Sequence, residues 1–182
     1  NMNKSLSYPL LLSTALLSAS VYAKVAPMWE VGELSHSTGY TVAADSQTSH
    51  QFGLVKHSNT CGADELYLSW TSSSPDVWSL AGKTVTMDAN FDGVSISLPL
   101  KVVAIKPGTG NSHEIIMGHV FANSELLNLM THSDAVNVLI PATDAMSQHL
   151  DAGNDRFSMQ GFNEAREQAL SRCHNMSSLA SN

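Results

Sequence analysis

The chain has 182 residues, of which 43% are hydrophobic and 14% charged, and its formal net charge is −7 at pH 7. A chain of this length can bury a real hydrophobic core. The negative charge makes phosphate backbones and anionic lipids poor partners, so we do not expect nucleic acid to be a ligand.

The N-terminal segment has the pattern of a secretory signal peptide. Lys4 supplies a positive charge, residues 10–23 (LLLSTALLSASVYA) supply a short apolar stretch, and Val21 and Ala23 stand at the small-residue positions before a cleavage site. A membrane anchor is the weaker interpretation, because the stretch is short for a bilayer and is interrupted by Ser and Thr. We therefore predict a signal peptide over residues 1–23 and a single β-rich exported domain over residues 24–182. The mature protein would be periplasmic or secreted and have no membrane span.

The two cysteines of the chain, Cys61 and Cys173, both fall in the exported part. In an oxidising compartment two thiols of one small domain are expected to pair. A bridge across 112 positions would stabilise the fold by about 4–5 kcal/mol in the chain-entropy description. The alternative of two free or redox-active thiols lacks a C-x-x-C motif.

A period of two dominates the region from Trp29 to Val120, as is typical of strands with one buried face. The segments YTVAA (residues 40–44) and QFGLV (51–55) keep a common apolar face if they pair so that their residue numbers sum to 94. The segment ELYLSWT (65–71) places two leucines and a tryptophan on one face.

The clearest hairpin surrounds Asp92-Gly93, a dipeptide that favours the positive φ angles of a type I′ turn. A two-residue loop pairs Phe91 with Val94 and gathers the apolar residues of both strands on one face. The alternation is expected to continue to Ala104. Pro99 cannot donate a ladder hydrogen bond, so it marks an edge, bend or bulge.

The segment HEIIMGH, from His113 to His119, invites a comparison with zinc-binding helices, in which the second His follows the first by four residues. Here the spacing is six residues, which separates the two rings by about 120° around a helix. On a strand they would lie about 20 Å apart, too far to share one ion. We predict an ordinary strand.

After Val120 the pattern changes to mixed helix and strand. We predict a short helix from the cap at Asn123 or Ser124, a strand in AVNVLIP (135–141), a loop over residues 143–154 with one helical turn, and a strand in DRFSMQ (155–160). An amphipathic helix over residues 161–175 should turn Cys173 toward the core, followed by a frayed tail after His174. The fold class is α+β: an antiparallel sheet or sandwich of seven to nine strands, a short internal helix, and a C-terminal helix tethered by the disulfide.

The order of these features resembles a known group of exported proteins. A Cys leads into ELYLSW, then GKTVTMD, a helix with ELLNLM, the strand VNVLIP and finally FSMQGFNEAREQALSRC. It is similar to the small VasI/TagO-like proteins associated with type VI secretion, and more loosely to the invasion-associated locus B family. The basic Arg that often accompanies the first Cys in the VasI kind is absent. The resemblance implies an accessory or interaction protein of the cell envelope without a cofactor.

The sequence gives little support for catalysis or metal binding. No ligand spacing is satisfied locally among the eight histidines, and the question of a site assembled from distant ones stays open for five of them: His113, His119, His132, His149 and His174. There is no G-x-S-x-G elbow. We predict no catalytic residue, no cofactor and no metal, with a hydrolase whose site is not visible in the sequence as an alternative.

Binding to a protein partner is the favoured function. Trp78 lies in a long connection (residues 71–82) and Trp29 precedes the first strand, and aromatic residues are enriched at interfaces. Either ring could instead cover the core. We predict a non-catalytic protein-binding domain of the cell envelope, with an inhibitor or immunity protein against a toxin or hydrolase as the alternative.

Overall fold

The computed structural model describes residues 25–46 and 49–180, so the predicted signal peptide lies outside the described residues. Nine strands form one antiparallel sheet in the order β1-β2-β3-β4-β7-β6-β5-β8-β9. The strands are β1 Glu30–Leu34, β2 Ser37–Ala43, β3 Gln51–His57, β4 Glu65–Ser72, β5 Thr84–Phe91, β6 Val94–Pro107, β7 His113–Phe121, β8 Ala135–Leu139 and β9 Asn154–Ser158. The helices are α1 Ser124–His132 and α2 Phe162–Ala180, with short 3₁₀ segments η1 Val77–Leu80 and η2 Ala145–His149. The predicted fold class is confirmed.

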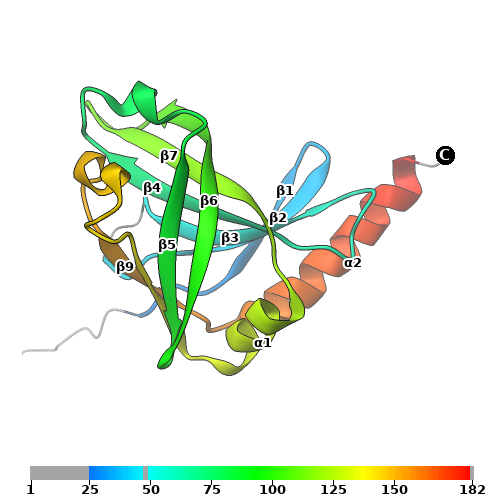
Figure 1. Cartoon of the computed structure of the whole chain (residues 1–182). Coiled ribbons are helices and arrows are strands. Elements are labelled where there is room, and N and C mark those ends of the chain that lie inside the picture. The colour runs from blue at the N-terminus through cyan, green and yellow to red at the C-terminus, as the bar shows by residue number, and fades with distance from the viewer. Residues whose placement is uncertain (1–24, 47–48, 181–182) are drawn as a thin grey trace, which may run out of the picture.

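The sheet curls until its last strand meets the end of β2 (Figure 1). The N–H of Asp45 donates to the carbonyl of Arg156 at 2.9 Å, and the N–H of Trp29 donates to that of Gln160 at 3.2 Å. The inner face of the curled sheet is therefore enclosed. It carries the alternating apolar residues of every strand from β2 to β9.

The strand registers predicted from the apolar pattern are confirmed. Tyr40 pairs with Leu54 across β2 and β3, and Phe91 pairs with Val94 across a turn in which Asp92 and Gly93 have φ angles of 47° and 99°. Pro99 lies on the part of β6 that pairs only with β5, because the ladder with β7 begins at Lys101, so its missing N–H interrupts no ladder. The expected alternation is confirmed up to Val102 and is wrong at Ala104, because the register between β6 and β7 shifts between these two residues.

Helix α1 begins where the capping signal predicted. The side chain of Asn123 accepts a hydrogen bond from the N–H of Leu126, which satisfies one of the helix's first donors. Leu126 and Met130, four residues apart, bury the inner side of the helix.

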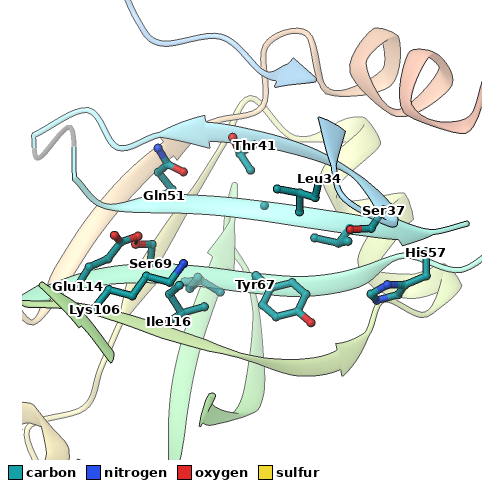
Figure 2. A pocket seen from close by; sticks show the side chains of 13 residues that line it. Leu34, Ser37, Thr41, Gln51, His57, Tyr67, Ser69, Lys106, Glu114 and Ile116 are labelled. Atoms are coloured by element: carbon teal, nitrogen blue, oxygen red, sulfur yellow. Dashed lines mark hydrogen bonds between the residues drawn. The ribbon is translucent and has the colours of Figure 1, made fainter. Parts of the chain in front are cut away.

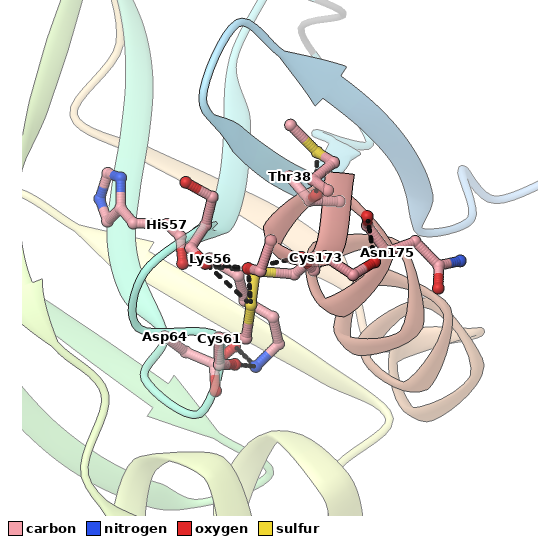
Figure 3. Close-up of a disulfide and its surroundings, with 11 residues drawn as sticks. Thr38, Lys56, His57, Cys61, Asp64, Cys173 and Asn175 are labelled. Carbon is pink, nitrogen blue, oxygen red and sulfur yellow. Dashed lines mark hydrogen bonds and ion pairs between the residues drawn. A yellow bond between two sulfur atoms is a disulfide. The ribbon is translucent and has the colours of Figure 1, made fainter. Parts of the chain in front are cut away.

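Helix α2 covers one end of the curled sheet and is linked to it by the disulfide Cys61–Cys173, as predicted (Figure 3). The Cα atoms of the two cysteines lie 5.7 Å apart, within the usual range. The expected fraying after His174 is wrong, since the helix continues to Ala180. Its last turns are held because Met176 accepts a hydrogen bond from Thr38, and Ser177 donates to the carbonyl of Ser58. Among the described residues, no helix combines the length and apolar character needed to cross a bilayer.

Candidate functional site: a groove on the outer face of the sheet

A groove of about 380 Å³ crosses the outer face of β2, β3, β4 and β7, on the side of the sheet away from the core (Figure 2). Apart from the core residue Leu68, its lining residues on β3 and β4 occupy the positions that alternate with the inward ones, so the same period of two that builds the core also builds the groove. The lining comprises Leu34, Ser37, Thr41, Gln51, Gly53, Val55, His57, Tyr67, Leu68, Ser69, Lys106, Glu114 and Ile116.

Glycines keep this face hollow. A Cβ atom at Gly53 would lie 2.5 Å from Cγ2 of Thr41, so no larger residue fits there without displacing that side chain. A Cβ at Gly118 would lie 2.6 Å from the ring of Tyr67, which rests directly on the β7 backbone. The missing side chains leave a floor formed by Val55 and Ile116, both partly exposed.

One end of the groove holds a hydrogen-bonded group centred on Glu65. Its Oε2 lies 2.8 Å from Nε2 of His57, and its Oε1 accepts from the hydroxyl of Tyr67 at 2.9 Å. The Glu65 side chain is only 7% exposed, whereas that of His57 is 40% exposed. Burial, followed by the hydrogen bond to Glu65, raises the pKa of Tyr67 to about 12. Chemically, this end offers an oriented imidazole whose second nitrogen can bind a ligand.

The opposite end is also polar. Oγ of Ser69 donates to Oε1 of Glu114 at 2.5 Å, and Gln51 and Lys106 complete this rim. Gln51 and Glu114 also line a second hollow of about 550 Å³, which continues toward His113. The two hollows share these two residues and therefore lie next to each other on the sheet.

The two tryptophans considered for partner contact occupy different environments. Trp78, on η1, is 57% exposed and packs edge-on against His113, with ring centroids 5.2 Å apart. His113 shares the inward side of β7 with Ile115, so Trp78 lies on the core side of the sheet and not in the groove. Trp29 is 6% exposed and packs against Phe162, and its Nε1–H donates to the carbonyl of Ser158 at 2.8 Å. Of the two alternatives that the sequence left open for Trp29, the structure therefore shows the core position, with little surface exposed to a partner.

A buried ionic cluster, which the sequence analysis missed, lies beneath the disulfide (Figure 3). Asp64 is fully buried and receives Lys56 Nζ at 2.9 Å, Arg166 Nη2 at 3.2 Å and the hydroxyl of Tyr40. Lys56 Nζ also donates to the carbonyl of Cys61 at 2.9 Å. Burial, and then the charge of Asp64, raises the pKa of Tyr40 well above its usual range. The sequence contained one sign of this cluster, because Lys56 occupies an inward-facing position of β3 in line with Phe52 and Leu54.

A second buried polar pair joins β9 to the segment before β3. Nδ1 of His50 lies 2.9 Å from Oδ2 of Asp155, and its ring stacks on Trp70 at 4.2 Å. Both side chains are almost fully buried, and Nε2 of His50 has no hydrogen-bond partner among the described atoms. Burial lowers the pKa of His50, against the opposing effect of Asp155. This pair holds the closure of the sheet.

The remaining histidines lie apart from one another where the structure describes them. His132 bonds to the carbonyl of Asn128 on its own helix, His149 bonds to Ser74, and His174 is exposed on α2. Over residues 25–46 and 49–180, no three His, Cys, Asp or Glu side chains gather in a geometry that could hold a metal ion. His113 and His119 lie on strand β7, as the sequence predicted.

The chain matches no known family, no curated protein and no solved structure.

Proposed function

We propose that this protein is a non-catalytic binding domain of the periplasm or the extracellular space, and that its outer groove receives an extended segment of a partner protein. The observation that carries the proposal is the arrangement of the groove: an apolar floor formed by Val55 and Ile116, with charged groups only at its two ends. A cleft of this kind binds through shape and through a few oriented polar contacts.

The dimensions suit a polypeptide in an extended conformation. Strand β3 runs beneath the groove from Gln51 to His57, which is about 20 Å at 3.3 Å per residue. Aliphatic side chains of the partner would lie over Val55 and Ile116. Basic or amide groups would meet Glu114 at one end and His57 with Glu65 at the other.

The covalent chemistry supports the proposed compartment. The Cys61–Cys173 bridge supports an oxidising environment. The resemblance of the segment from Cys61 to Cys173 to VasI/TagO-like proteins supports an accessory role in the cell envelope.

Site-specific photocrosslinking in cells of the native host tests this proposal. We would place a benzoylphenylalanine at Val55, in the groove, and as a matched control at Thr84, an exposed position of β5 on the other half of the sheet. We expect a discrete adduct from position 55 and none from position 84. An envelope or secretion component in that adduct supports the accessory role, and a single hydrolase supports an inhibitor. Equal adducts from both positions, or none from position 55, would reject the groove as the binding site.

A further inference from the structure

Strand β1 ends the sheet at its unclosed edge, and we propose that this edge binds a basic, extended segment of a partner protein as a tenth strand. The inference goes beyond the groove, since it concerns backbone hydrogen bonds along β1 and does not require any ligand in the groove.

The hydrogen-bond pattern of β2 identifies which groups of β1 face outward. The N–H of Ser58 donates to the carbonyl of His36, and the N–H of Ala44 donates to that of His50. Residues of an antiparallel strand alternate between the two neighbouring strands, so the even-numbered residues from 36 to 44 bond to β3 and the odd-numbered ones bond to β1.

The partners of those odd residues on β1 are Glu30, Gly32 and Leu34, whose backbone groups therefore point toward β2. It follows that Val31 and Glu33 direct their N–H and C=O groups away from the sheet. Trp29, two residues earlier, obeys the same rule, because its N–H bonds outward to the carbonyl of Gln160.

Of the backbone groups that point away from the sheet at Trp29, Val31 and Glu33, only the N–H of Trp29 has a backbone partner among the described residues. Gln160 covers the position at Trp29, but no described residue bonds the backbone of Val31 or Glu33. Four of the five residues of β1 are exposed to solvent, and a Cβ atom at Gly32 would meet nothing within 4 Å above the strand. Unpaired donors and acceptors at an accessible edge are a template for an added strand.

Charge determines the kind of strand that fits. Both ionisable residues of β1, Glu30 and Glu33, are exposed carboxylates, and the whole chain carries −7. A second copy of β1 would bring two further carboxylates to the same short ladder, which opposes self-pairing. Glu30 and Glu33 point to opposite faces of β1, and a strand with Lys or Arg at alternate positions places its cations beside one of these carboxylates instead.

Two defined probes test the inference: an eight-residue peptide of alternating Lys and Val, and the corresponding peptide of alternating Glu and Val. Amide exchange measured by NMR should show Val31 and Glu33 unprotected in the free exported domain. Saturating lysine peptide should slow their exchange at least about tenfold and leave Gly32, already bonded to β2, unchanged. The glutamate peptide should have no effect.

Two sets of variants distinguish binding at the β1 edge from nonspecific electrostatic attraction of the lysine peptide to an acidic protein. Val31→Pro removes an outward donor and should weaken binding of the lysine peptide at least about fivefold, with little loss of stability. Gly32→Pro, its matched control, removes a donor that faces β2 and should release β1 from the sheet. The double charge reversal Glu30→Lys with Glu33→Lys keeps the backbone intact and should transfer the preference to the glutamate peptide.

Three results would overturn the inference. The first is amide protection of Val31 and Glu33 that grows with protein concentration, which would show that a second copy occupies the edge. The second is binding of the lysine peptide that is unchanged in Val31→Pro. The third is a preference for the lysine peptide that survives the charge reversal. Loss of groove crosslinks with intact edge binding would reject the proposed function alone.

Discussion

Asp64 and Glu65 are neighbouring carboxylates at the start of β4, yet they face opposite sides of the sheet. Asp64 points inward to Lys56, Arg166 and Tyr40 beneath the disulfide, and its side chain is fully buried. Glu65 points outward to His57 and Tyr67 at the end of the groove.

The comparison shows that two neighbouring carboxylates can have different roles when they face opposite sides of a sheet. The inward carboxylate neutralises a lysine that the core would not otherwise tolerate, so it acts on stability. The outward carboxylate of Glu65 orients a partly exposed imidazole and a tyrosine, and we expect the domain to fold without these contacts. Variants on the inner side should therefore change stability, and variants on the outer side should change binding.

Removal of the disulfide should have the largest effect on the inner side. The double variant Cys61→Ala with Cys173→Ala should lower the free energy of unfolding by up to about 4–5 kcal/mol, because the unfolded chain regains the freedom of a 112-residue loop. Urea denaturation of the variant, beside the oxidised and reduced native protein, measures this loss. A change below about 1 kcal/mol would show that α2 docks without the bridge.

Asp64→Ala should be the next most severe change, at about 3 kcal/mol or more, because it leaves Lys56 buried without a counter-charge. Urea denaturation again provides the measurement. Asp64→Leu combined with Lys56→Met removes both charges and should recover much of the loss. If the double variant were no more stable than Asp64→Ala, the unpaired lysine would not be the cause.

The His50–Asp155 pair predicts an acid-sensitive closure of the sheet. The pKa of His50 is lowered in the folded state, so the unfolded chain binds the proton more readily. Stability from the neutral ring is complete above about pH 6.5 and declines as the pH falls below that value, with a slope of at most about 1.4 kcal/mol per pH unit.

Urea denaturation between pH 5 and 8 measures this slope. The charged groups acting on His50 are Asp155 and Asp151, so His50→Gln, which keeps both, is the suitable control. The variant should have a flatter profile in this range. Identical slopes in the two proteins would assign the acid sensitivity to other groups.

Glu65→Gln should have the smallest effect on stability, below about 1 kcal/mol, since its ion-pair partner His57 is well exposed to solvent. It should lower the pKa of Tyr67 from about 12, while burial keeps that value above 10. Ultraviolet titration of the tyrosines, with Tyr67→Phe to assign the signal, follows this change. An unchanged pKa would mean that burial alone sets it.

The sequence predicted the parts of this fold that depend on local pattern. The pairing of Tyr40 with Leu54, the turn at Asp92-Gly93 and the cap at Asn123 each follow from residues close together in the chain or from a single alternation. The disulfide followed from compartment and cysteine number, because only one pairing was possible.

The candidate site could not be predicted in the same way. The groove depends on the adjacency of β4 and β7, which places Tyr67 over Gly118, and no local pattern specifies that order of strands. The environments of Trp29 and His50 depend on the contact between β9 and the start of the sheet, more than 100 residues away. A lysine in an inward position on β3 was the one local sign of the ionic cluster.

The assignment of partner binding to the groove is tested most directly by the affinity of the purified partner, identified by crosslinking, for two matched variants. Leu34→Asp places a charge in the groove, and Leu139→Asp places the same charge on β8, where the leucine is similarly exposed, at 46% against 55%. We predict that Leu34→Asp weakens binding at least about tenfold and that Leu139→Asp changes it less than about twofold, with both proteins folded. Equal affinities for the two variants would contradict the account.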